Sequence, residues 1–121
     1  MSALKPRQEA FYRRVVALYR EAGMTPPSLR TAAHLIGAPP DAIRAMLHIG
    51  IERGEIADAG EGIYFAREAL HRLAEQIKAL PAPVKVAQVR DLTGSSRRYA
   101  AAALRWLRQH GLVDASLYGE P

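Results

Sequence analysis

The sequence repeats itself without a gap at an offset of 57 residues. Apolar residues and glycines recur at matching positions, in the pairs Pro26 and Pro83, Leu29 and Val86, Leu35 and Leu92, Gly37 and Gly94, Leu47 and Leu104, Gly54 and Gly111, Ile56 and Val113, and Gly62 and Gly119. A repeat constrains a chain strongly, because each copy must fold into the same small unit. A unit of this size buries too little apolar surface to be robust alone, so the two copies are expected to pack on each other.

The first copy is expected to contain three helices and a hairpin. Hydrophobic periodicity, capping residues and helix-ending glycines predict helices over 6–22, 28–37 and 39–54. The period then changes, and two short strands are expected over 55–58 and 62–65. Three helices followed by a β-hairpin form the winged-helix pattern, which is a helix-turn-helix with a wing.

The second copy follows without a flexible linker. Its expected elements are a helix over 67–80, an extended piece over 84–86, a short helix over 87–93, a long helix over 96–110, and a strand beginning at Leu112 and Val113. The counterparts of Tyr64 and Phe65 would fall at Pro121 and beyond it, so the second wing is expected to be incomplete.

We therefore predict a mainly α fold with small β-hairpin wings, built as two tandem winged-helix modules. The first module spans 1–66 and serves as a spacer or packing module. The second module spans 67–121 and binds the partner. Because one helix follows the first wing directly, the pair is expected to be fairly rigid.

Positive charge is concentrated in the second module. The chain has 17 Lys and Arg residues against 12 Asp and Glu residues, a net charge of +5. Residues 84–111 hold six basic side chains and one acid, Asp91. A basic segment of this kind indicates a polyanionic partner, with a solvated surface as the plain alternative.

The predicted helix 96–110 carries an arginine stripe. At about 100° per residue, one quarter of its circumference holds Arg97, Arg98, Arg105 and Arg108. The stripe contains no acid, and the opposite side of the helix is apolar. Guanidinium groups suit phosphate because their planar fork can donate two parallel hydrogen bonds. We therefore predict that this helix binds a phosphate backbone.

The start of the same helix favours anion binding as well. Ser95 and Ser96 are expected to cap the helix, and its first backbone N–H groups would be free to bind an anion. The aligned positions of the first module are Pro40, Asp41, His48 and Ile51, which form no basic stripe. Nucleic-acid binding is therefore assigned to the second module.

Other functional classes have no support in the sequence. Cysteine is absent, which excludes disulfides, iron–sulfur clusters and thiolate zinc sites. The four histidines lack metal-ligand spacing, and no phosphate-binding loop, nucleophile elbow or paired carboxylate appears. We therefore expect no catalytic residue, metal or cofactor. No apolar run approaches the ~20 residues of a membrane span, and the N-terminus lacks a signal peptide, so a soluble, cytoplasmic protein without a membrane partner is expected.

The segment from Val86 to Tyr99, VAQVRDLTGSSRRY, carries a family resemblance together with the following Leu104-Arg105-Trp106-Leu107. It resembles the last winged helix of the bacterial selenocysteine-specific elongation factors. Pro26-Pro27-Ser28, Gly54-Glu55-Ile56 and residues 62–67 look like the winged helix before it, so the resemblance covers nearly the whole chain. One departure is that the family usually continues with a basic stretch, whereas residues 112–121 contain no arginine and two acids.

The resemblance implies RNA binding. In that family an N-terminal part binds GTP and selenocysteinyl-tRNA, and the C-terminal winged helices bind a selenocysteine-insertion hairpin in the messenger RNA. It implies an mRNA hairpin as partner, the ribosome as partner of the full-length factor, and no catalysis here, because the GTPase part is absent from this chain. We also expect a monomer. The candidate RNA contacts are Ser95, Ser96, Arg97, Arg98 and Tyr99 by position in the motif, with the basic residues Arg105, Arg108 and Lys85.

Two other functions remain open from the sequence. In a DNA-binding transcription regulator, the last helix would lie in the major groove, where Arg97 and Arg98 could contact guanine. A winged helix that binds only protein would not need an acid-free arginine stripe. For RNA, two to four phosphate contacts predict that log affinity falls with log salt at a slope of roughly −2 to −4.

Overall fold

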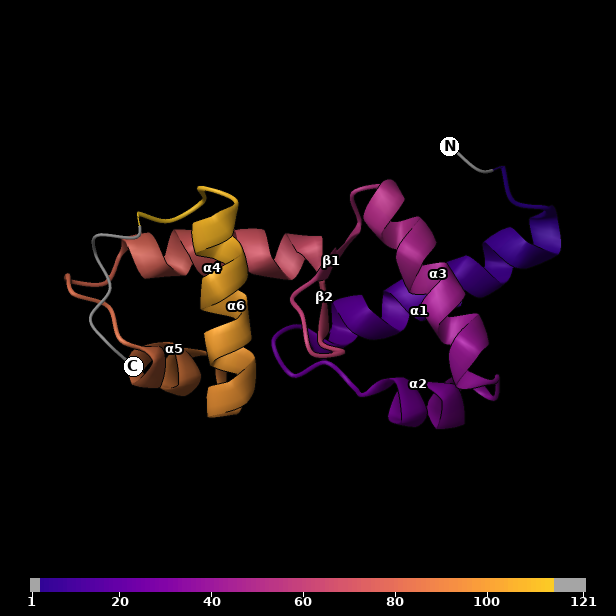
Figure 1. Ribbon diagram of the computed structural model, residues 1–121, viewed down its shortest axis with the longest axis horizontal. Coiled ribbons are helices and arrows are strands. Elements are labelled where there is room, and N and C mark those ends of the chain that lie inside the picture. Colours follow the sequence, from indigo (N-terminus) through magenta and orange to yellow (C-terminus); the bar gives the residue numbers. More distant parts are fainter. Residues whose placement is uncertain (1–2, 115–121) are drawn as a thin grey trace.

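The structure, a computed structural model, describes residues 3–114 as two helical lobes joined by a hairpin (Figure 1). The first lobe contains α1 (Pro6–Ala22), α2 (Leu29–Ile36), α3 (Pro40–Glu52), β1 (Ile56–Asp58) and β2 (Tyr64–Ala66). The second lobe contains α4 (Arg67–Lys78), α5 (Val86–Thr93) and α6 (Arg97–Gln109). The described chain is thus mainly helical with one small antiparallel hairpin, as predicted.

The sequence repeat extends to the backbone conformation at the ends of α3 and α6. In each lobe, the residue after a glycine donates its amide to the carbonyl five positions earlier. The bonds run from Glu55 to Gly50 at 2.8 Å and from Leu112 to Leu107 at 2.9 Å. The intervening glycine has a φ of 75° in the first lobe and 67° in the second, a conformation that is costly for other residues.

The end of the described chain differs from the prediction. The expected strand beginning at Leu112 is wrong, because the amide of Leu112 belongs to the turn that closes α6 and Val113 continues as a bend. Val86 was expected to be extended, and instead it begins α5. The prediction of an incomplete second wing falls on residues 115–121, which lie outside the described residues.

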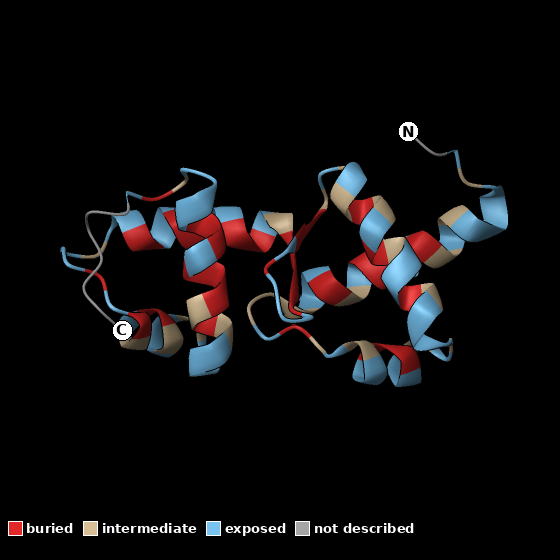
Figure 2. Cartoon of the chain, viewed as in Figure 1, coloured by how far each residue is buried: buried red, intermediate tan, exposed pale blue. Residues whose placement is uncertain are grey.

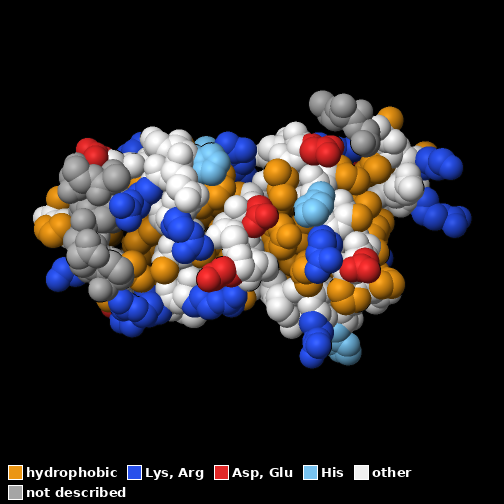
Figure 3. All heavy atoms as spheres, viewed as in Figure 1, with side chains coloured by type: hydrophobic (Ala, Val, Ile, Leu, Met, Phe, Trp, Pro, Cys, Tyr) orange, Lys and Arg blue, Asp and Glu red, His pale blue; other side chains and the backbone are white. Residues whose placement is uncertain are grey.

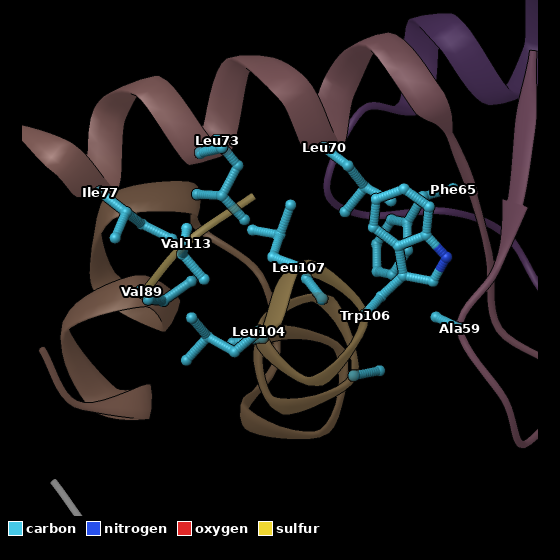
Figure 4. Packing of buried hydrophobic residues seen from close by; sticks show 14 of the residues in the cluster. Ala59, Phe65, Leu70, Leu73, Ile77, Val89, Leu104, Trp106, Leu107 and Val113 are labelled. Carbon is cyan, nitrogen blue, oxygen red and sulfur yellow. The ribbon is translucent and has the colours of Figure 1, made fainter. Parts of the chain in front are cut away.

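The hairpin between the lobes contributes to two hydrophobic cores. Ile56 and Tyr64 pack in the cluster of the first lobe, whereas Ala57 and Phe65 pack in the cluster of the second. Neighbouring side chains of a strand point to opposite faces, so each lobe covers one face of the hairpin. Most of both strands is buried as a result (Figure 2). Phe65 belongs to the same cluster as Trp106 of α6 (Figure 4). The core of the second lobe therefore reaches back across the predicted limit at residue 66.

Gly50 allows α3 to approach β1 closely. A Cβ atom at this position would lie 2.5 Å from Cγ1 and 3.1 Å from Cβ of Ile56. We expect Gly50→Ala to lower the free energy of unfolding by about 1–3 kcal/mol through overpacking, although alanine has the higher helix propensity. Urea unfolding measures the change. Ala45→Gly, at an exposed position of the same helix, measures the difference in helix propensity between alanine and glycine without overpacking. A Gly50→Ala variant as stable as the wild-type chain, or more stable, would contradict the prediction.

Candidate nucleic-acid interface

Helix α6 begins at Ser96, which caps it as predicted. The Ser96 Oγ accepts a hydrogen bond from the backbone N–H of Tyr99 at 3.1 Å. This bond satisfies one of the amides that every helix start leaves without an internal partner. Ser96 and Arg97 are both exposed. The first turn of α6 therefore presents backbone N–H groups and an arginine to solvent.

Ser95 has a different position from the one we expected. It is buried, with 8% of its surface exposed, and its hydroxyl donates to the carbonyl oxygen of Met24 at 2.7 Å. Met24 belongs to the connector between α1 and α2 in the first lobe. The Ser95 hydroxyl is thus neither a cap of α6 nor a group on the exposed surface, but a hydrogen-bond donor between the two lobes.

Helix α6 is amphipathic, as its periodicity predicts. Its buried side consists of Ala100, Ala102, Ala103, Leu104, Trp106 and Leu107. Its exposed side carries four arginines, which we call the arginine face: Arg97, Arg98, Arg105 and Arg108. Figure 3 shows basic side chains gathered over α6 and beside α5, with few acidic ones among them. The helix contains no acidic residue of its own.

Two members of the arginine face contact the hairpin turn, residues 59–62. Arg98 Nη2 donates to the carbonyl oxygen of Glu61 at 3.0 Å, and Arg105 Nη2 donates to the carbonyl oxygen of Ala59 at 2.9 Å. The Arg98 Nε also lies 3.9 Å from Glu61 Oε2. Because both of these side chains are more than half exposed, the ion pair is weak. These contacts occupy part of each guanidinium and leave other N–H groups unused.

The other two arginines lie along the outer edge of the face. Within residues 3–114, Arg97 has no hydrogen-bond or ion-pair partner. Arg108 is exposed in the last turn of α6. On a helix of about 100° per residue, Arg97 lies roughly 80° and Arg108 roughly 60° from Arg105, which faces the hairpin turn. Arg97 is therefore the member of the arginine face most available to a partner.

Tyr99 and Lys85, the remaining candidates, lie apart from this edge. Tyr99 is half-buried, and its ring meets Phe65 edge-on with the centroids 6.3 Å apart. Lys85 is exposed just before α5, where its backbone N–H donates to Gln88 Oε1 at 2.7 Å. Tyr99 therefore has mainly a packing role, while Lys85 offers a separate positive charge.

His110 is exposed at the end of α6, and its ring stacks on Trp106 at a centroid distance of 3.9 Å. Its Nδ1 lies 2.9 Å from the carbonyl oxygen of Trp106.

Within residues 3–114, no group of three or more His, Cys, Asp or Glu residues could hold a metal ion. No helix of that range is long and apolar enough to cross a membrane.

The positive charges of the first lobe are largely used inside it. Arg53 makes two hydrogen bonds to the Glu9 carboxylate, at 2.8 and 2.9 Å, and these bonds hold the pKa of Glu9 below its ordinary value. Burial, together with a hydrogen bond to Glu55, raises the pKa of Tyr12 to about 12. Arg13, Arg20 and Arg44 are also ion-paired. The first lobe thus has fewer cations to offer an anion than its count of basic residues implies.

The fold has a known counterpart. No protein-family model and no curated protein matches the chain. A solved structure does match: the mRNA-binding domain of elongation factor SelB from E. coli, in complex with SECIS RNA. The TM-score is 0.73, over 89% of this chain and 89% of that one. The chain has the winged-helix fold of that domain. The predicted fold class is therefore confirmed, and at 22% sequence identity the likeness to SelB concerns the fold alone.

Proposed function

We propose that this chain binds an RNA hairpin of the selenocysteine-insertion type in messenger RNA, as the C-terminal part of a selenocysteine-specific translation elongation factor. The observation that carries the proposal is the fold shared with the SelB domain that was solved with SECIS RNA. Two further observations support it. One is the motif RDLTGSSRRY over residues 90–99, and the other is the exposed, acid-free arginine face of α6.

The arginine face suits the backbone of a folded RNA. Arg97 and the free amides of the first turn of α6 would hold one phosphate. A guanidinium has five N–H donors, so Arg98 and Arg105 can each bind a phosphate while one donor stays on the hairpin turn. Arg108 and Lys85 would add contacts along the strand, and the Ser96 hydroxyl remains the cap of α6. The bases of an unstacked loop or bulge would supply sequence specificity.

The hairpin turn favours RNA over duplex DNA. Arg98 and Arg105 draw residues 59–62 against one side of α6. The major groove of B-DNA is about 12 Å wide and admits a single helix. A helix with a turn against its arginine side fits such a groove poorly. It can still follow phosphates on the outside of an A-form stem, whose deep major groove is not read by side chains.

The parts of the complete factor would have different tasks. This chain would bind the hairpin as a monomer in the cytoplasm and take no part in catalysis. GTP binding and contact with the ribosome would belong to the other parts of the factor. The acid-free arginine face distinguishes this function from that of a winged helix that binds only protein.

A competition between nucleic acids tests the proposal. We expect a bulged RNA hairpin to displace duplex DNA of equal length from the chain, because the arginine face is open to a phosphate backbone but not to insertion into a groove. Binding measured over a series of salt concentrations should show a slope of log affinity against log salt of roughly −2 to −4. Stronger binding of the DNA duplex would favour the transcription regulator instead, and binding of neither would remove nucleic acid from the function.

A further inference from the structure

Among the residues that the structure describes, three hydrogen bonds join the start and middle of α6 to the first lobe, and each ends on a backbone carbonyl oxygen. They run from Ser95 to Met24 at 2.7 Å, from Arg105 to Ala59 at 2.9 Å, and from Arg98 to Glu61 at 3.0 Å. The acceptors come from two separate segments, the connector between α1 and α2 and the hairpin turn. Helix α6 is therefore held to the first lobe on two sides.

The Ser95 hydrogen bond fixes the point from which α6 starts. Ser95 immediately precedes the N-cap and is buried, whereas its acceptor residue Met24 is partly buried. Loss of a buried donor leaves the carbonyl oxygen of Met24 without its partner, which costs more than the loss of an exposed hydrogen bond. The position of the first turn of α6 relative to the first lobe thus depends on this bond.

The contacts of the hairpin turn fix the direction of two guanidinium groups. A long, exposed arginine loses rotamer freedom when it binds a phosphate, at a cost to affinity. Arg98 and Arg105 have already lost part of that freedom, because each donates to a carbonyl oxygen of the turn. The turn approaches these arginines only while α6 keeps its place against the first lobe.

We infer that Ser95 is a positioning residue for the RNA-binding face: its hydrogen bond to Met24 holds α6 so that the hairpin turn can orient Arg98 and Arg105 toward the RNA. The inference rests on the proposed function. It also gives the first lobe a role that the sequence did not indicate, since a spacer would not need to contact the binding residues. The Ser95 hydroxyl itself does not touch the RNA, because it is buried against the connector.

A double-mutant cycle tests this role. The affinity for a bulged RNA hairpin is measured for the wild-type chain, Ser95→Ala, Arg98→Ala and the double variant, well below the thermal midpoint of each. Ser95→Ala should weaken binding about fivefold, the factor that corresponds to one ordinary hydrogen bond. Because Ser95 acts through Arg98, the double variant should lose clearly less than the product of the two single losses.

Thr25→Ala is the matched control. Thr25 lies in the same connector as Met24, and its hydroxyl donates to the carbonyl oxygen of Ala22 at 2.9 Å, so both partners belong to the first lobe. This variant should bind RNA like the wild-type chain. Wild-type affinity of Ser95→Ala, or losses that multiply in the double variant, would overturn the inference and leave the proposed function intact. A wild-type chain that binds no hairpin would overturn both.

Discussion

Replacement of both Arg97 and Arg98 by alanine is expected to weaken binding of a bulged RNA hairpin about 100-fold at roughly 0.1 M salt. Each hydrogen bond to a charged group contributes about 1.5–3 kcal/mol, and a 100-fold loss corresponds to about 2.7 kcal/mol. The thermal midpoint should fall only slightly, because both side chains are exposed and Arg98 loses only a surface hydrogen bond and a weak ion pair with Glu61. Fluorescence anisotropy of a labelled hairpin and a thermal melt measure the two quantities.

The matched control removes the same charge from the other lobe. Arg7 and Arg30 are exposed, and neither has a hydrogen-bond or ion-pair partner in the described part of the chain. Arg7→Ala combined with Arg30→Ala should cost little RNA affinity. The salt slope should become shallower by about 1.4–1.8 in the α6 variant, which loses two phosphate contacts, and should stay nearly constant in the control. Equal losses in the two variants would assign binding to net charge and exclude a specific role of α6.

The helices could be predicted from the sequence because their limits are set locally. Pro6 opens α1 at the predicted residue, and the Ser28 side chain caps α2 by accepting from the amide of Thr31 at 3.1 Å. The predicted helix over 96–110 is observed as α6, Arg97–Gln109. The amphipathic character of α6, and hence the exposure of its arginines, follows from the same local periodicity.

The partners of those arginines could not be predicted, because they are backbone carbonyl groups far away in the sequence. The contact of Arg105 spans 46 residues and that of Arg98 spans 37. No side-chain pattern marks a carbonyl oxygen as an acceptor. The role of Ser95 could not be predicted either, because two consecutive serines precede the helix and only one of them can be its N-cap. The tertiary fold decides that Ser96 caps α6 and that Ser95 is buried against Met24.

The sequence contains a sign of the shared hairpin. The predicted first module, residues 1–66, ends with β2, whose residues Tyr64, Phe65 and Ala66 are apolar on both faces. A strand with one solvated face alternates between apolar and polar residues, whereas a continuous apolar run indicates that both faces are covered. The composition of β2 was therefore consistent with a hairpin enclosed between two lobes.

Phe65→Ala is accordingly expected to destabilise the whole chain rather than one lobe. Phe65 is fully buried in the core of the second lobe, while its neighbour Tyr64 packs in the first. Truncation of a buried phenylalanine costs about 3–5 kcal/mol, a large part of the 5–15 kcal/mol by which a domain is typically stable. Urea unfolding should show this loss. Leu35→Ala, at a leucine that is 61% exposed, should stay within about 0.5 kcal/mol of the wild-type chain.

Two probes distinguish a shared core from two independent ones. Trp106, the one tryptophan of the sequence, lies in the core of the second lobe, so its fluorescence follows that lobe, whereas far-UV circular dichroism follows the helices of both. Coincident urea transitions in wild type and in Phe65→Ala are expected, because the hairpin cannot leave one core without leaving the other. A Phe65→Ala variant whose fluorescence transition moves to lower urea while most of the circular dichroism stays in place would show that the lobes unfold separately. In that case the first lobe could not keep α6 in the position from which Arg98 and Arg105 are proposed to bind RNA.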